Sequence, residues 1–154
     1  MVNQFKRTII YLIGTGLGSG YAPIAPGTAG SLLAAVLFWI LPLNMHWWIF
    51  IIVVGFLVGL WVSTQIEREK GEDPGLVVID EMIGQWLTLI FLPSTLFYLA
   101  GGFLLFRLFD IFKPFPINRS QNLKEGWGIM TDDVLAGLYA NLLLQFVHWS
   151  GVWS

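Results

Sequence analysis

Charged residues occupy four short regions of this chain, and the long stretches between them carry no charge. The eight Lys and Arg and ten Asp and Glu residues are confined to residues 6–7, 67–81, 107–125 and 132–133. The charge-free stretches are residues 8–66, 82–106 and 134–154. A charged side chain is costly inside a bilayer, so this pattern is typical of a chain that enters a membrane several times.

The composition agrees with a membrane protein and excludes several other classes. Hydrophobic residues make up 56% of the 154 residues and charged residues only 12%, with eight Trp. A net charge of −2 leaves no basic surface to neutralise nucleic-acid phosphates, so no nucleic-acid partner is expected. Cysteine is absent from the sequence, which excludes disulfides, thiolate metal sites and a cysteine nucleophile.

Turn residues divide the charge-free stretches into helices. Pro42 and Asn44 separate two apolar runs and predict a helical hairpin over residues 28–41 and 47–66. The first limb is short beside the ~20 residues that cross a hydrocarbon core of about 30 Å, and the second only just reaches that length. The second charge-free stretch, residues 82–106, forms either one membrane span or, broken at Pro93, two short helices. We favour a second hairpin, because Pro93 removes a backbone donor and biases the preceding residue away from helix.

The second hairpin decides where the charged clusters meet. As one helix rising about 1.5 Å per residue, the stretch would hold Asp80 and Arg107 roughly 40 Å apart, whereas the hairpin brings them together. Two hairpins and a final span over residues 134–154 make a single all-α domain, a polytopic membrane bundle of about five short transmembrane or half-immersed helices. All charged clusters then lie on one side, which their positive charges place in the cytoplasm. His46 and His148 fall on the other side, which argues against a histidine-dependent phosphatase.

Four segments on the charged side contain residues suited to binding phosphate or metal. The first, "GTGLGSGYAPIAPGTAGS" over residues 14–31, lacks the spacing of a nucleotide-binding loop. It is either a flexible turn before a helix capped by Thr28 or Ser31, or a helix N-terminus whose free amides bind phosphate. The second, "VVIDEMIGQW" over residues 77–86, runs Asp80 and Glu81 directly into an apolar helix. These carboxylates either suit the helix dipole or pair with a cation.

The third segment, "FRLFDIFKPFPI" over residues 106–117, places two cations and a carboxylate on one helical face. Arg107, Asp110 and Lys113 recur every three residues until Pro114 ends the helix. They form either an internal ion pair or a pair of cations for a multiply charged anion. In the second case Asp110 would orient the cations or bind metal.

The fourth segment, "GIMTDDVLAG" over residues 128–137, carries two adjacent aspartates. At a helix start, one of Asp132 and Asp133 would be the cap and the other a first-turn residue. Alternatively, Asp133, Gly137 and Asn141 follow at steps of four, which favours close approach of another helix beside a cation site. Oxygen-only ligands favour Mg2+ or Mn2+. Together the four segments indicate metal-assisted phosphoryl transfer or hydrolysis of a lipid phosphate ester.

These segments resemble, in order and spacing, the motifs of the phosphatidylglycerophosphatase A family. The resemblance rests on "GSGYAPIAPGTAGS", "VIDEMIG", "FRLFDIFKPFPI" and "GWGIMTDDVLAG", and it covers about residues 14–140. It implies a Mg2+-dependent enzyme of the bacterial cytoplasmic (inner) membrane that converts phosphatidylglycerophosphate to phosphatidylglycerol and inorganic phosphate. The implied catalytic residues are Asp80, Glu81, Asp110, Asp132 and Asp133, all but Asp110 also binding metal. The implied phosphate-binding residues are Arg107, Lys113, Gly27, Thr28 and Ser31.

Several alternatives stay open on the sequence alone. Either water attacks phosphorus directly or one of the carboxylates forms an aspartyl-phosphate. A small transporter or channel could use the same carboxylates for protons or divalent cations, although the far side of the bundle lacks Lys, Arg, Asp and Glu. Residues 67–73 are expected to form a solvated loop. The sequence does not indicate the oligomeric state.

Overall fold

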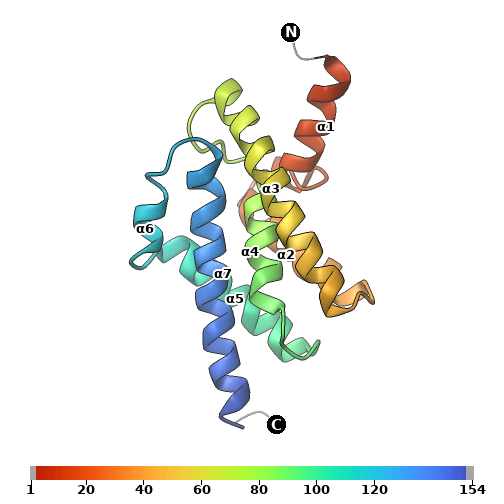
Figure 1. Cartoon of the computed structure of the whole chain (residues 1–154), viewed down its shortest axis with the longest axis vertical. Coiled ribbons are helices and arrows are strands. Elements are labelled where there is room, and N and C mark those ends of the chain that lie inside the picture. Colours follow the sequence, from red (N-terminus) through yellow and green to blue (C-terminus); the bar gives the residue numbers. More distant parts are fainter. Residues whose placement is uncertain (1–2, 152–154) are drawn as a thin grey trace.

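The computed structural model of the chain describes residues 3–151. Within this range it consists of helices joined by turns and contains no strand. The helices in chain order are α1 (Gln4–Gly14), α2 (Pro26–Ile40), α3 (Met45–Lys70), α4 (Ile79–Leu89), α5 (Leu96–Phe112), α6 (Ile117–Ser120) and α7 (Gly126–Trp149), with a 3-10 turn η1 (Ser19–Tyr21) (Figure 1). The all-α class predicted from the sequence is confirmed.

Local sequence signals set the ends of several helices. Asn44 caps α3 by accepting a hydrogen bond from the backbone N–H of Trp47 at 3.2 Å. Gly71, with a φ of 100°, follows the last residue of α3 in a conformation that side chains disfavour. At the end of α5, Lys113 adopts the left-handed conformation before Pro114. The predicted stop before this proline is therefore confirmed.

Both predicted turns are present, between α2 and α3 and between α4 and α5. α4 and α5 pack on each other as the hairpin predicts, whereas α2 and α3 meet only near their turn, because α4 lies between them. Two helix boundaries also differ from the predictions. α3 continues to Lys70, so the solvated loop expected over residues 67–73 is wrong for its first half. Glu, Arg and Lys favour helix, and no breaker precedes Gly71. α7 begins well before Asp132 and Asp133, so these aspartates lie inside the helix and do not cap it. Residues 152–154 of the predicted final span lie outside the described residues.

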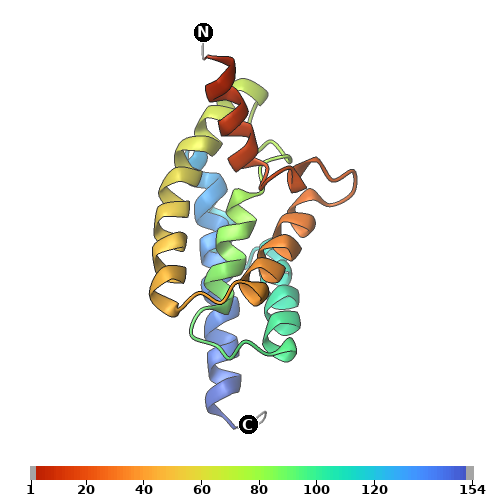
Figure 2. The ribbon, with the colours of Figure 1, turned by 90° about the vertical axis from the view of Figure 1, so that its right-hand side faces the viewer.

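α4 is the central helix of the bundle. Nine of its eleven residues are buried, and it packs between α3 and α7 on one side and α2 and α5 on the other (Figures 1 and 2). Two glycines allow the close approach to α7: a Cβ on Gly137 would lie 2.4 Å from the carbonyl oxygen of Gly84. Lower in the same interface, Asn141 donates hydrogen bonds to the carbonyls of Thr88 and Ile90 at 2.9 and 2.8 Å. The close approach of another helix that was predicted along Gly137 and Asn141 is confirmed.

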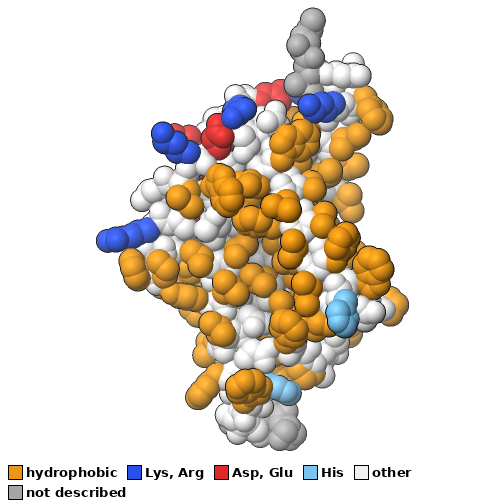
Figure 3. Space-filling model, viewed as in Figure 1, with side chains coloured by type: hydrophobic (Ala, Val, Ile, Leu, Met, Phe, Trp, Pro, Cys, Tyr) orange, Lys and Arg blue, Asp and Glu red, His pale blue; other side chains and the backbone are white. Residues whose placement is uncertain are grey.

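The bundle has one charged end and apolar sides. Lys, Arg, Asp and Glu gather over the upper part of the molecule, while the histidines lie on the lower part (Figure 3). Large apolar side chains are exposed along the helices below the charged end, including Trp39, Phe50, Leu104, Leu142 and Phe146. Among the described helices, α3 alone is both long and apolar enough to cross a membrane, and α2 is a shorter apolar helix.

Candidate active site

A cavity of about 750 Å³ opens at the charged end, where the first turn of α4 meets α7, the end of α5 and the end of α3. Nine carboxylates and two lysines line it: Glu67, Glu72, Asp73, Asp80, Glu81, Asp110, Glu125, Asp132, Asp133, Lys113 and Lys124. The five carboxylates predicted from the sequence are all among them. Negative charge is in large excess, so an anionic substrate would be repelled unless a cation were bound as well.

Three carboxylates form the inner part of this cavity. Asp80 and Glu81 come from the first turn of α4, and Asp133 comes from the facing turn of α7. One ligand oxygen from each lies within 4.8 Å of the others. An oxygen of each, Oδ1 of Asp80, Oε2 of Glu81 and Oδ2 of Asp133, is buried without a hydrogen-bond partner. Unpaired buried carboxylate oxygens are costly, and an all-oxygen set of this kind fits a hard divalent cation such as Mg2+.

Burial and mutual repulsion make the metal-free trio retain protons. Desolvation, followed by repulsion from Glu81 and Asp133, raises the pKa of Asp80 well above its ordinary value. Desolvation and repulsion from Asp110 and Glu81 do the same to the pKa of Asp133, and burial raises the pKa of Glu81. A bound cation would favour the ionised form of all three carboxylates, so cation binding and proton release are expected to be coupled.

The two predicted phosphate-binding cations are each paired with a carboxylate. Arg107 contacts Asp110 through Nη1, within α5. Lys113 reaches across to α7 and donates to Oδ2 of Asp132. Burial raises the pKa of Asp132 to about 6, although the bond from Lys113 lowers it. Asp132 is therefore engaged with Lys113 and lies outside the close trio, whereas Asp133 belongs to it.

The glycine-rich segment brings the N-terminus of α2 to the same site. A Cβ on Gly27 would lie 2.1 Å from Oε1 of Glu81 and 3.3 Å from Nη1 of Arg107, so only glycine fits there without displacing them. Neither Thr28 nor Ser31 caps this helix, because the cap position is Ala25. The Ser31 hydroxyl is buried and donates to the Gly27 carbonyl at 2.8 Å within its own helix. The first-turn amides of α2 have no earlier helical carbonyl to bond.

The sequence model of the phosphatidylglycerophosphatase A family matches residues 12–148. The chain belongs to this family. Its relatives include phosphatidylglycerophosphatase A of Escherichia coli, 41% identical over 90% of this chain and 84% of the relative, and that of Haemophilus influenzae, 40% identical over 91% and 89%. A Bacteroides thetaiotaomicron protein named provisionally as a phosphatidylinositol-3-phosphatase is 43% identical over 90% and 92%. No solved structure matches the chain.

Membership of the phosphatidylglycerophosphatase A family confirms the resemblance drawn from the four motifs, and with it the expectation of a lipid phosphatase rather than a transporter. The structure adds residues that the motifs did not indicate. Glu67 lines the acidic cavity from the end of α3, with Oε2 buried and unpaired. Gln85, one turn below Glu81, is fully buried with both amide atoms unpaired.

Helix packing explains why Glu67 was missed. Its segment was expected to be a loop, and the sequence gives no sign that the end of α3 meets the start of α7. That contact is made by Gly126, whose amide donates to the Thr64 hydroxyl at 3.2 Å, and by an ion pair between Arg68 and Glu125. The polarity of Gln85 inside an apolar helix was a usable sequence signal for a buried polar side chain near the site.

Proposed function

We propose that this protein is a Mg2+-dependent phosphatase that hydrolyses phosphatidylglycerophosphate to phosphatidylglycerol and inorganic phosphate. The observation that carries the proposal is the trio of Asp80, Glu81 and Asp133, each with one buried oxygen that lacks a hydrogen-bond partner, in a member of a lipid-phosphatase family. In this proposal Asp80, Glu81 and Asp133 hold the ion. When bound, Mg2+ would neutralise phosphate charge and acidify a water molecule.

The remaining polar groups are suited to binding the phosphate. Arg107 pairs with Asp110 through Nη1, while its Nε is buried and has no partner, so the guanidinium retains donors for an oxyanion. We assign Asp110 and Asp132 to orienting Arg107 and Lys113 respectively. The Gly27 and Thr28 amides, at the N-terminus of α2, are placed to donate to the same anion. Ser31 would act by stabilising this turn through its bond to Gly27.

The same proposal places the bundle in the bacterial cytoplasmic membrane. α3 is apolar enough to cross the bilayer, and exposed apolar side chains on α2, α5 and α7 favour further immersed helices. The charge-free stretches begin at Met82 and Val134, so the carboxylates lie outside the immersed segments, at the cytoplasmic surface. A lipid phosphate could then reach the cavity while its acyl chains stay in the bilayer.

Two lipid monoesters are suggested by the relatives' names, and the experiment must compare them. We expect phosphate release from phosphatidylglycerophosphate in mixed micelles to require Mg2+ and to stop with chelator. We expect phosphatidylinositol 3-phosphate to be hydrolysed more slowly at equal surface concentration. A higher kcat/KM for the inositol lipid would overturn the substrate assignment, and equal release with chelator would overturn the metal dependence.

A further inference from the structure

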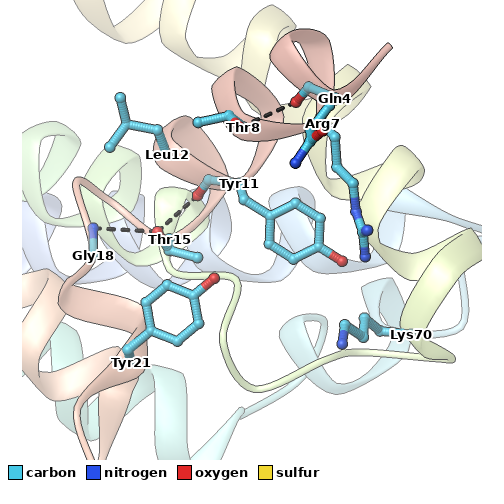
Figure 4. A pocket seen from close by; sticks show the side chains of 9 residues that line it. All are labelled: Gln4, Arg7, Thr8, Tyr11, Leu12, Thr15, Gly18, Tyr21 and Lys70. Atoms are coloured by element: carbon cyan, nitrogen blue, oxygen red, sulfur yellow. Dashed lines mark hydrogen bonds between the residues drawn. The ribbon is translucent and has the colours of Figure 1, made fainter. Parts of the chain in front are cut away.

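A second cavity, of about 520 Å³, lies between α1, the turn that follows it and the end of α3 (Figure 4). Its lining shares no residue with the acidic cavity. The residues whose chemistry matters are Arg7, Leu12, Tyr21 and Lys70. None of the described lining residues is a carboxylate, which is the opposite of the acidic cavity.

The cationic groups of this second cavity are available to an anion. Arg7 pairs with Glu69, and the Tyr11 hydroxyl donates to the same carboxylate at 2.9 Å, so the guanidinium is held in place over the Tyr11 ring. The Lys70 ammonium makes no ion pair or hydrogen bond with any described residue. Arg7 and Lys70 together carry two positive charges against the single negative charge of Glu69, so the net charge of these three groups is positive. In the close view, the Arg7 head lies beside the Tyr11 hydroxyl, with Lys70 below them (Figure 4).

An apolar stripe leads along α1 to this cavity. Phe5, Ile9 and Leu12 recur at helical spacing and are 72%, 39% and 50% exposed. Leu12 also lines the cavity, and Tyr21, which lines it from η1, is 63% exposed. An amphipathic helix with basic residues beside an exposed apolar face is the form of an element that lies in a membrane surface.

We infer that the second cavity binds the phosphate-bearing headgroup of an anionic phospholipid. The cations and the Tyr21 hydroxyl match the phosphodiester, and the apolar stripe on α1 matches the upper part of the acyl chains. A phospholipid carries both features in one molecule, whereas a free phosphate ion would leave the apolar stripe unused. The site acts separately from the acidic cavity, so it binds lipid without a divalent cation.

The test measures lipid binding to the full chain in detergent with excess chelator, so that the acidic cavity holds no metal. Native mass spectrometry would count bound short-chain phosphatidylglycerol, with short-chain phosphatidylcholine and inorganic phosphate as the other probes. The variants are Arg7→Gln and Lys70→Gln. The matched control is Lys6→Gln, which removes one positive charge from α1, the helix that carries Arg7. The Lys6 side chain lies over the Trp61 ring, outside the cavity.

We expect each cavity variant to weaken phosphatidylglycerol binding about tenfold, as loss of one charge-assisted contact does, and the control to change it less than about twofold. Lys70 is exposed, so its replacement should leave the melting temperature unchanged. Equal binding of phosphatidylcholine, or unchanged binding in Lys70→Gln, would overturn the inference. Inorganic phosphate that competes as strongly as the lipid would reassign the cavity to a free phosphate.

Discussion

The contact between Gly137 and Gly84 offers a sharp test of how the fold positions the site. A Cβ on Gly137 would lie 2.4 Å from the Gly84 carbonyl oxygen, where ordinary contacts begin at 3.4 Å. Gly137→Ala must therefore open the α4–α7 interface by about 1 Å, because the obstacle is backbone and cannot rotate away. Overpacking of this kind costs about 2 kcal/mol of folding stability.

The same displacement acts directly on the proposed metal site. Asp80 and Glu81 lie on α4 one turn above Gly84, and Asp133 lies one turn above Gly137. Two oxygens bound to one Mg2+ at about 2.1 Å can be no more than about 4.2 Å apart. The three ligand oxygens lie within 4.8 Å of one another and must come within this shorter limit to share an ion, so a further 1 Å between the two helices works directly against binding.

We expect Gly137→Ala to lower kcat about a hundredfold and to raise the Mg2+ concentration for half-maximal phosphate release. The assay is phosphate release in mixed micelles over a Mg2+ titration, with thermal unfolding measured in parallel. Gly101→Ala on α5 is the matched control, since its added Cβ would meet only a Leu144 methyl at 3.7 Å. Wild-type Mg2+ dependence and kcat in Gly137→Ala, with the control also normal, would refute this account of the interface.

Three further predictions concern charge in the acidic cavity. Burial raises the pKa of Asp80 and Asp133 above their unfolded values, so the metal-free fold binds extra protons. Its stability should therefore fall as the pH rises above about 4 and through these raised pKa values, and Mg2+ should restore most stability at the highest pH. Melting curves with and without chelator that show the reverse order would contradict this. Lys113→Gln should lower kcat/KM at least tenfold, because it removes a proposed phosphate contact and leaves Asp132 unpaired; kinetics within twofold of wild type would count against both roles. Glu67→Gln should raise the half-maximal Mg2+ concentration a few-fold at unchanged melting temperature, because one negative charge leaves the cavity wall; an unchanged Mg2+ titration would exclude Glu67 from the electrostatics of the site.

The charge pattern predicted most of the fold because it reflects a strong physical constraint. Keeping every charged cluster on one side required two hairpins, and Pro93 showed where the second one turns. The same constraint brought Asp80 and Arg107 to one end of the bundle, since the hairpin returns the chain to its starting side. The five predicted carboxylates line one cavity for this reason.

Side-chain partners were harder to predict, because they depend on helix rotation and on exact helix ends. Lys113 was placed on a face shared with Arg107, but it follows the last turn of α5 in a left-handed conformation and reaches Asp132 instead. Spacing along one helix cannot show such a contact across two helices. Glu67 was missed for a related reason, since the first half of an expected loop proved to be the last turn of α3.

We propose that Asp80 and Asp133, from two different helices, bind one divalent cation for hydrolysis of a lipid phosphate. The most direct measurement is Mg2+-dependent phosphate release from phosphatidylglycerophosphate by Asp80→Asn and Asp133→Asn, with Mn2+ binding to each variant followed by electron paramagnetic resonance. We expect both variants to fold, to bind Mn2+ at least about tenfold more weakly and to lose activity on the order of a hundredfold. Wild-type Mn2+ affinity in either variant, or full activity with chelator present, would contradict it.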